Sequence, residues 1–299
     1  MNSRYYNVAG AIFTVSVPSL DCWSVNPFSL MENYEPFEVS ESEISSKASS
    51  VFVLELESGS SPEYVEEICQ SEECQKIICG HTAESQSVFD FYLQDISVGT
   101  LVCSKDYATA KLLIPEKISV SQVKFAINNA LMVLYAVATA TMNTVLFHAA
   151  AVVYQGRAFI FLGKSGTGKS THARLWLKYN GAELLNDDNP VVRWDENTQS
   201  AVVYGSPWSG KTPCYKNEKV TLDGIVLLSQ APYNKIEKLQ GVQAYAALVT
   251  SISGKRWDES IANGLHRTEN ALASNVPVWY LECLPDEAAA RLCLENVAG

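Results

Sequence analysis

The chain has 299 residues, of which 47 % are hydrophobic and 18 % charged, and its formal net charge is −11. This composition is typical of a folded globular protein with one large or two ordinary domains. The acidic balance argues against a general binder of nucleic acids or anionic membranes, because both need basic surface.

The N-terminal residues alternate between polar and apolar and show no secretory signal, so the eight cysteines are expected to be reduced thiols of a cytoplasmic protein. Residues 1–116 are predicted to be β-rich, because short runs of β-branched and aromatic residues are separated there by polar turns. Strands are expected at residues 7–17, 49–58, 87–94, 99–104 and 108–114.

Two polar stretches lie between these strands. Residues 38–50 are expected to form a solvated loop, and residues 61–78 a short helix capped by Ser61. No catalytic constellation is found in residues 1–116. This part is therefore predicted to be an N-terminal β-rich α+β domain that recognises a substrate or a partner.

Residues 119–143 change to apolar residues at helical spacing. We interpret this stretch as a buried helix. The alternative is a membrane span, which the interruptions at Thr139 and Thr141 disfavour. The change of pattern puts the domain boundary near residue 116, so the domains are predicted to be 1–116 and 117–299.

The second domain is predicted to alternate strands and helices. Strands at 144–154 and 158–162 form a hairpin across Gln155-Gly156, and the helix 169–180 is stopped by Gly181. The remaining elements are a short strand at 182–188, a hairpin of strands 190–194 and 200–205, strands at 222–230 and 235–240, helices at 241–252 and 258–274, a strand at 276–283 and a helix from Asp286.

The stretch that follows the strand 158–162 matches the phosphate-loop pattern G-x-x-x-x-G-K-[ST]. Glycines let successive backbone N–H groups curl around an anion, and the helix that follows directs its dipole toward it. Lys169 is expected to reach the β- and γ-phosphates, and Ser170 to ligate Mg²⁺. The predicted nucleotide-binding residues are Gly163, Lys164, Ser165, Gly166, Thr167, Gly168, Lys169, Ser170 and Thr171.

Two carboxylates, Asp187 and Asp188, follow Lys169 by about 18 residues, which is one helix plus a return to the sheet. Phosphoryl transfer needs a metal held by a carboxylate and a group that orients or deprotonates the nucleophile. One aspartate can therefore hold the metal while the other takes the substrate proton, and the spacing alone does not order the two roles. The alternative is that the stretch is only a polar turn.

Other polar residues are weaker candidates. His148 lies in an otherwise apolar strand beside the phosphate-loop strand, where a satisfied core histidine and a functional one are equally expected. Lys211 ends a Gly/Pro/Ser-rich loop that can deliver it to the transferring phosphoryl group or be a simple turn. Arg256 and Arg267 are further cations, whereas His172 and Arg174 are expected to be ordinary helix residues.

These residues, in this order, resemble the HPr kinase and ATP-dependent phosphoenolpyruvate carboxykinase superfamily, and within it the HPr-kinase-related serine kinases. The shared pattern is a His-containing strand, a hairpin, a phosphate loop, a short helix and Asp-Asp; it is strong over residues 145–195 and loose from there to Gly299. The resemblance implies an α/β fold with a mixed-sheet P-loop kinase core. It also implies His148 and Asp188 at the substrate end, and Asp187 with Ser170 at the magnesium.

The resemblance is incomplete at one position of the loop, because Thr171 stands where HPr kinases carry Glu. The HPr-docking signature beyond the Asp pair is also missing, and the chain is shorter than a carboxykinase. HPr is therefore not the expected substrate.

The sequence thus predicts a kinase that transfers the γ-phosphoryl group of ATP, with Mg²⁺, to a hydroxyl of a protein or peptide serine or of a small compound. Asp188, His148 and Lys211 are the predicted catalytic residues. The alternatives are a nucleotide-binding regulatory module without transfer activity and an ATPase or phosphohydrolase. No nucleic-acid or membrane partner is expected. The acceptor, the choice between ATP and GTP, and a homo-oligomeric state are left open.

Overall fold

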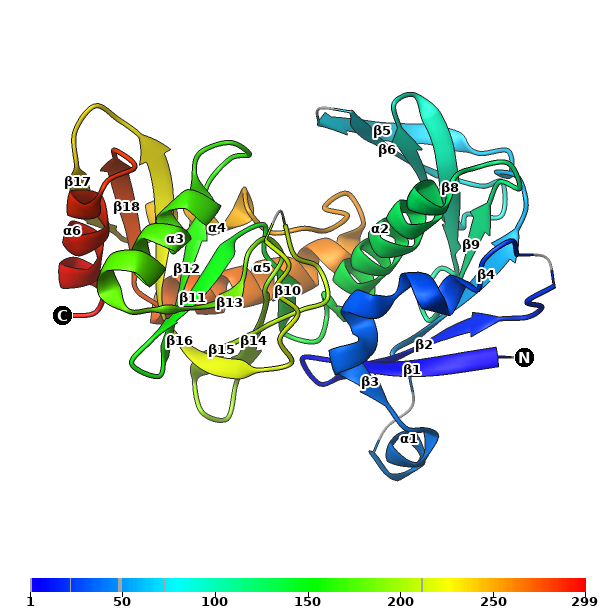
Figure 1. The fold of residues 1–299 in the computed structure, drawn as a ribbon, viewed down its shortest axis with the longest axis horizontal. Coiled ribbons are helices and arrows are strands. Elements are labelled where there is room, and N and C mark those ends of the chain that lie inside the picture. Colours follow the sequence, from blue (N-terminus) through cyan, green and yellow to red (C-terminus); the bar gives the residue numbers. More distant parts are fainter. Residues whose placement is uncertain (1, 22, 48–49, 73, 211) are drawn as a thin grey trace. The chain divides into compact units, whose positions relative to one another are not determined.

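The structure is a computed structural model that describes residues 2–21, 23–47, 50–72, 74–210 and 212–299. The chain divides into two compact units, Met1–Ala138 and Thr139–Gly299 (Figure 1). The division falls after the long helix that follows residue 116, whereas the sequence pattern placed the boundary before it. The helix belongs with the first unit because its buried face packs on that unit's strands.

The first unit is built on a nine-stranded mixed sheet, counted over its described residues, in the order β3-β1-β2-β4-β9-β8-β7-β6-β5. The pairs β2–β4 and β4–β9 are parallel and the others antiparallel. The strands are β1 (Asn2–Val8), β2 (Ala11–Val17), β3 (Glu38–Val39), β4 (Phe52–Ser58), β5 (Val65–Glu72), β6 (Gln75–His81), β7 (Ser87–Leu93), β8 (Ile96–Cys103) and β9 (Thr109–Ile114). Two 3-10 helices, Pro27–Leu30 and Glu32–Phe37, and helix α1 (Glu41–Lys47) lie between β2 and β4.

Helix α2 (Val120–Thr139) supplies the apolar face that covers this sheet. Most residues at the predicted helical spacing are buried, among them Ala126, Ile127 and Leu134, and the Tyr135 hydroxyl donates to the Val8 carbonyl at 3.1 Å. Among the described helices, α2 is long and apolar enough to cross a membrane by length and composition, and 44 % of its apolar window is buried in the protein. One face of α2 is thus packed on the sheet, in agreement with the buried-helix interpretation.

Two predictions for the first unit are wrong. Residues 61–78 form most of the antiparallel hairpin β5–β6 instead of a helix, because pairing of β6 with β7 satisfies the backbone and outweighs the weak helical preference of the Glu- and Gln-rich sequence. Residues 38–50, expected to be a solvated loop, contain helix α1, whose first turn carries Glu41 and Glu43 at the positive end of the helix dipole.

The second unit is a mixed α/β unit whose sheet, over its described residues, has the order β10-β14-β15-β16-β12-β11-β13, with β18 added beside β16 and β17 beside β18. The pairs β12–β16 and β16–β18 are parallel. The strands are β10 (Thr144–Leu146), β11 (Ala150–Tyr154), β12 (Arg157–Leu162), β13 (Glu183–Asn186), β14 (Val191–Asp195), β15 (Ser200–Tyr204), β16 (Lys219–Gln230), β17 (Lys235–Leu239) and β18 (Val278–Cys283).

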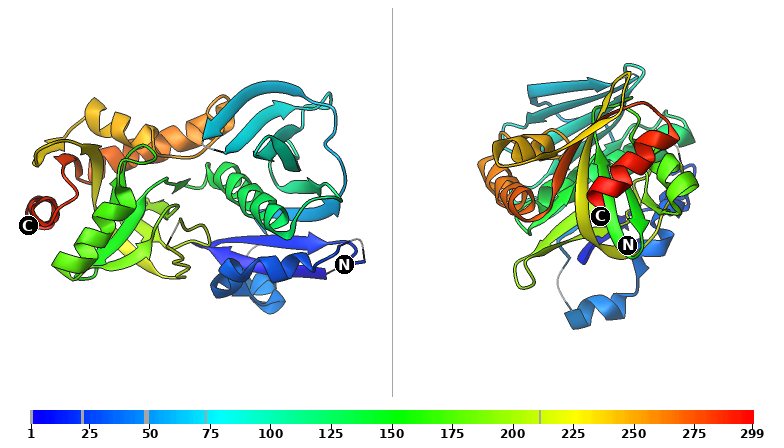
Figure 2. Two further views of the ribbon diagram at one scale, coloured as in Figure 1. Left: turned by 45° about the horizontal axis from the view of Figure 1, so that its top comes forward. Right: turned by 90° about the vertical axis from the view of Figure 1, so that its left-hand side faces the viewer.

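Helices α3 (Lys169–Asn180), α4 (Val242–Val249), α5 (Glu259–Asn275) and α6 (Glu287–Val297) complete the second unit (Figures 1 and 2). Phe159 and Phe161 of β12 pack with Trp176 of α3 and Cys293 of α6 in one buried cluster. The predicted elements of this unit are confirmed in kind, except that the single strand expected before Gln155 is two strands, β10 and β11, and His148 lies in the bend between them. The β11–β12 hairpin turns at Gln155-Gly156 with φ of 50° and 75°, values that a two-residue hairpin turn requires.

Candidate active site

Three strand ends of the second unit meet at one edge of its sheet. Strands β12 and β13 both pair antiparallel with β11, so both end at the edge where β11 begins. Phe161 and Asn186 lie opposite the first two residues of β11. The ends of β12 and β13 are separated by two strand spacings, roughly 10 Å. The residues that leave the sheet at this edge are Gly163, Asp187 and His148.

The phosphate loop joins β12 to α3 at this edge. Gly163, Gly166 and Gly168 have φ of 150°, 76° and 107°, in the region that side chains rarely adopt, so the loop depends on glycine at each of them. Helix α3 begins at Lys169, which places the N-terminus of its dipole at the loop. The side chains of Ser170 and Thr171 in its first turn are half-buried.

Lys169 lies folded against its own loop. Its side chain is buried, and its Nζ donates to the carbonyls of Gly163 at 2.9 Å and Lys164 at 3.4 Å. Gln230, at the end of β16, braces the same loop, because its Nε2 donates to the Gly166 carbonyl at 3.1 Å and to the Thr167 carbonyl at 3.4 Å. Sequence reasoning missed Gln230; the available signal was that a strand parallel to β12 ends at the same edge.

His172 belongs to the core rather than to the site. Its ring is buried beside Phe161, and its Nε2 accepts the indole N–H of Trp176 at 3.1 Å. Burial lowers the pKa of His172 to about 4, so the ring is neutral at physiological pH. Arg174 is exposed. Both are ordinary helix residues, as the sequence predicted.

Asp187 is a buried carboxylate with the properties of a metal ligand. Its side chain is 3 % exposed, and its Oδ2 accepts the Thr212 N–H at 3.2 Å. Within the described part of the chain, it forms no ion pair with a lysine, arginine or histidine. A buried carboxylate is costly unless it is paired, and a divalent ion bound there would offset that cost.

The described residues contain no cluster of three or more His, Cys, Asp and Glu side chains that would hold a metal by themselves. A magnesium ion bound with a nucleotide takes most of its ligands from phosphates and water and needs one or two from the protein. Asp187 and Ser170 fit that smaller requirement. Lys211, the third predicted catalytic residue, lies outside the described residues, between Gly210 and Thr212.

Asp188 is in contact with His148. Its Oδ1 lies 3.2 Å from Nδ1 of His148, and its Oδ2 accepts the side-chain N–H of Asn189 at 2.7 Å. The His148 and Asp188 side chains are 40 % and 32 % exposed, so both are accessible to a substrate. The Ala149 N–H also donates to the Asp188 carbonyl at 2.8 Å, which joins the two chain segments. The structure thus brings His148 and Asp188 into contact, two residues that the family resemblance implied at the substrate end.

Asn186 shapes the turn that carries both aspartates. It is fully buried, and its Oδ1 accepts the N–H groups of Asp188 at 2.9 Å and Asn189 at 2.8 Å. Its Nδ2 donates to the Ser206 hydroxyl and to the Trp208 carbonyl, both at 3.1 Å. Sequence reasoning missed this residue, although an Asn that precedes Asp-Asp-Asn-Pro is a typical organiser of a turn.

Comparisons with known proteins found a matching family model and a similar solved structure. A family model described as "SynChlorMet cassette protein ScmC" matches residues 114–284, more than half of the chain. The chain belongs to the ScmC family. The span shared with ScmC proteins contains the phosphate loop, both aspartates and His148.

A solved structure, the HPr(Ser) kinase/phosphatase from Coxiella burnetii, is similar to this ScmC-family chain at 13 % sequence identity and a TM-score of 0.31. The similarity covers 51 % of this chain and 88 % of that one. No curated protein matches the chain.

Proposed function

We propose that the protein is a kinase that transfers the γ-phosphoryl group of Mg·ATP to a hydroxyl group. The observation that carries this proposal is the convergence at one sheet edge of a phosphate loop, a buried carboxylate and the 3.2 Å contact between His148 and Asp188. Phosphoryl transfer needs these three parts: a cradle for the phosphates, a metal ligand and a group that acts on the nucleophile.

The phosphate loop and the first turn of α3 bind the nucleotide. The loop amides and the helix dipole stabilise the phosphates, and Lys169, released from the carbonyls of Gly163 and Lys164, pairs with the β- and γ-phosphates. Ser170 and Asp187 hold the magnesium, which when bound neutralises the charge that develops on the phosphoryl oxygens.

Asp188 and His148 act on the acceptor. Asp188 accepts the hydroxyl proton, and His148, at 3.2 Å, fixes the orientation of its carboxylate. Asn189 occupies the other carboxylate oxygen at 2.7 Å, so the carboxylate has one preferred orientation. This assignment gives Asp187 the metal and Asp188 the proton, in agreement with the burial of the first and the partial exposure of the second.

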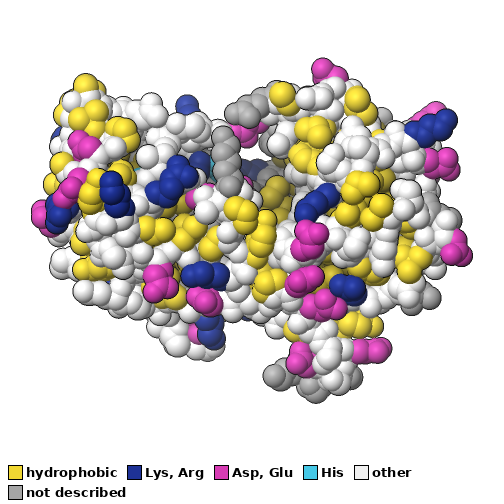
Figure 3. Space-filling view, in the orientation of Figure 1, with side chains coloured by type: hydrophobic (Ala, Val, Ile, Leu, Met, Phe, Trp, Pro, Cys, Tyr) yellow, Lys and Arg dark blue, Asp and Glu magenta, His cyan; other side chains and the backbone are white. Residues whose placement is uncertain are grey.

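The acceptor is a serine of a protein or peptide, or a small hydroxyl compound, and the first unit serves in its recognition. The net charge of −11 supports a function without nucleic acid or anionic membrane. On the face drawn in Figure 3, acidic and basic side chains are interspersed, which also disfavours a basic nucleic-acid surface there.

The test is to follow the label of γ-labelled ATP with purified protein and Mg²⁺ in the presence of serine-containing peptides and small hydroxyl compounds. A kinase places the label in an acceptor, and Lys169→Ala abolishes this transfer. Label that appears only as inorganic phosphate identifies an ATPase or phosphohydrolase. Nucleotide that binds and stays intact with every acceptor identifies a regulatory module and rejects the kinase.

A further inference from the structure

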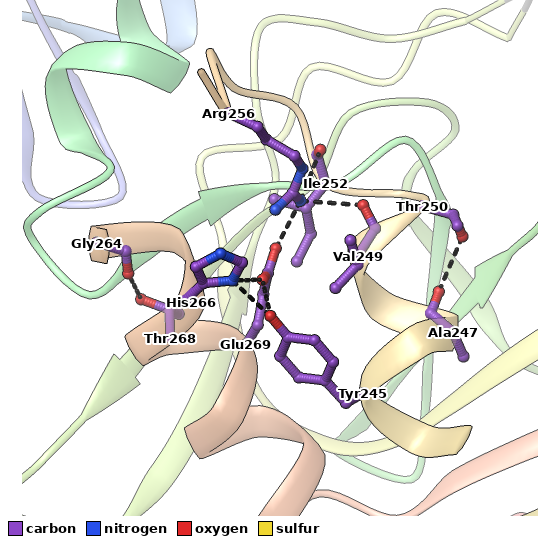
Figure 4. A network of polar contacts seen from close by, with 10 residues as sticks. All are labelled: Tyr245, Ala247, Val249, Thr250, Ile252, Arg256, Gly264, His266, Thr268 and Glu269. Carbon is purple, nitrogen blue, oxygen red and sulfur yellow. Dashed lines mark hydrogen bonds and ion pairs between the residues drawn. The ribbon is translucent and has the colours of Figure 1, made fainter. Parts of the chain in front are cut away.

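A second polar cluster joins helices α4 and α5 (Figure 4). At its centre is Glu269 of α5, which is fully buried. Its Oε1 lies 2.6 Å from Nη2 of Arg256, and its Oε2 accepts the Tyr245 hydroxyl at 3.1 Å and lies 3.2 Å from Nδ1 of His266. A buried carboxylate is tolerated when it is paired and hydrogen-bonded, and here three side chains meet that requirement.

Arg256 connects this cluster to the backbone of the segment between the two helices. Its Nη2, besides contacting Glu269, donates to the carbonyl of Val249 at 3.0 Å and weakly to that of Ile252 at 3.5 Å. Val249 is the last residue of α4, and Ile252 lies in the connecting segment 250–258. We call the contacts of Arg256 with Glu269, Val249 and Ile252 the arginine clip.

The segment that the arginine clip holds is the β-partner of the chain that carries His148. Residues 251–253 lie antiparallel to residues 146–148. The contacts are a β-bridge between Phe147 and Ile252, a hydrogen bond from the His148 N–H to the Ser251 carbonyl at 2.7 Å, and one from the Ser253 N–H to the Leu146 carbonyl at 3.0 Å.

On its other side, the segment that carries His148 is hydrogen-bonded to the turn that contains Asp187 and Asp188, the aspartate turn. The Phe147 N–H donates to the Pro190 carbonyl at 3.1 Å, and the Ala149 N–H to the Asp188 carbonyl at 2.8 Å. The backbone of His148 therefore lies between the aspartate turn and the segment 251–253. The 3.2 Å contact between the His148 ring and Asp188 depends on both neighbours keeping their positions.

We propose that Arg256, anchored by Glu269, is a positioning residue for His148. This inference rests on the proposed phosphoryl transfer, in which His148 and Asp188 act on the acceptor. When the arginine clip is removed, segment 251–253 keeps the backbone hydrogen bond from the Ser251 N–H to the Leu248 carbonyl at 2.9 Å but loses the contacts of Arg256 that link the chain around it to Glu269 of α5. The segment between β10 and β11 that carries His148 then loses support from one of its two neighbours, while the phosphate loop, which follows β12, keeps its contacts.

The kinetic test is a double-mutant cycle with Arg256→Ala and His148→Ala, assayed for transfer from Mg·ATP. Arg256→Ala should lower kcat about 10- to 100-fold, the cost of a misplacement of about 1 Å, and leave KM for Mg·ATP within a few-fold. In the His148→Ala background, the same substitution should cost less than about threefold, because the residue it positions is gone. Equal losses in the two backgrounds overturn the proposal.

Two further variants separate positioning from general instability. Glu269→Gln keeps the shape of the side chain and removes its charge, so it should reproduce the loss in kcat. Arg267→Ala removes an exposed arginine from the same helix and should leave kcat unchanged. A loss in Arg267→Ala that matches the loss in Arg256→Ala contradicts the proposal.

A readout that needs no acceptor keeps this inference distinct from the proposed function. Amide hydrogen exchange of His148 and Ser253 should accelerate about tenfold or more in Arg256→Ala, since a charge-assisted hydrogen bond is worth at least that factor. The amides of β12 should exchange as in the wild type. If the wild type transfers nothing, the proposed function fails, and exchange alone decides whether the arginine clip holds His148. Unchanged exchange at both amides rejects the clip whatever the activity.

Discussion

Replacing Asn186 by Ala should destabilise the aspartate turn more than its small change in size suggests. The side chain is fully buried, and it accepts the N–H groups of Asp188 at 2.9 Å and Asn189 at 2.8 Å. Both N–H groups lose their acceptor in Asn186→Ala, and each buried group left unpaired costs about 1–3 kcal/mol. The Trp208 carbonyl loses the Asn186 side chain as a donor but still accepts the Ser206 hydroxyl at 3.1 Å, so it adds little to the loss of stability. Since Asp188 is partly exposed, we expect a loss of about 2–4 kcal/mol in the free energy of unfolding.

Urea unfolding with linear extrapolation measures this loss. The matched control is Asn296→Ala, which removes an exposed Asn whose Nδ2 donates to a helix carbonyl at 2.8 Å, and should change the free energy of unfolding by less than about 0.5 kcal/mol. Phosphoryl transfer should fall in Asn186→Ala even at temperatures where the variant is folded. An unfolding free energy equal to that of Asn296→Ala would refute the role of Asn186 in the turn.

Three other predictions concern single residues. Lys169→Ala should abolish ATP binding or weaken it strongly in calorimetric titration with Mg²⁺, and unchanged affinity in a folded variant would contradict the phosphate loop. Asp187→Asn should raise the Mg²⁺ concentration needed for half-maximal activity, because an amide is a poor ligand for a hard cation, and a titration that overlays the wild type would remove Asp187 from the metal. Burial lowers the pKa of His172 to about 4, below its ordinary 6.5, so the unfolded chain takes up the proton at a higher pH than the folded chain. The contribution of His172 to the free energy of unfolding is therefore fully present above pH 6.5 and is lost as the pH falls toward 4. Between pH 7 and pH 4.5 the unfolding free energy of the wild type should fall about 2–3 kcal/mol more than that of His172→Gln; parallel declines in denaturant titrations would contradict this.

The sequence was most informative where local chemistry decides the structure. The glycines at 163, 166 and 168 predict positive φ, and φ is positive at all three in the structure. The turn at Gln155-Gly156 and the helix stop at Gly181, with φ of 69°, follow from the same conformational freedom.

Features that depend on distant partners were not predictable. The hairpin β5–β6 exists because β6 pairs with β7, and a window over residues 61–78 contains no sign of that partner. The structural roles of three residues depend on partners elsewhere in the chain. The partner of Asn186 is Ser206, that of Gln230 is Gly166, and that of Glu269 is Arg256. The residues around His148 in the sequence fit a core histidine and a functional one equally well, because its contact with Asp188 arises only when β11 and β13 pair.

The measurement that tests the central claim most directly is the separation of nucleotide binding from phosphoryl transfer in Asp188→Asn. Asn keeps the size of the side chain and an acceptor oxygen but cannot take a proton. Affinity for Mg·ATP should stay within a few-fold of the wild type, while transfer to the acceptor should fall about 10²–10⁴-fold, the range for loss of a general base, with the smaller loss favoured because positioning dominates this chemistry. Asp195→Asn, at the end of β14, is the control and should change neither quantity. Transfer that stays within twofold of the wild type in folded Asp188→Asn would contradict the account.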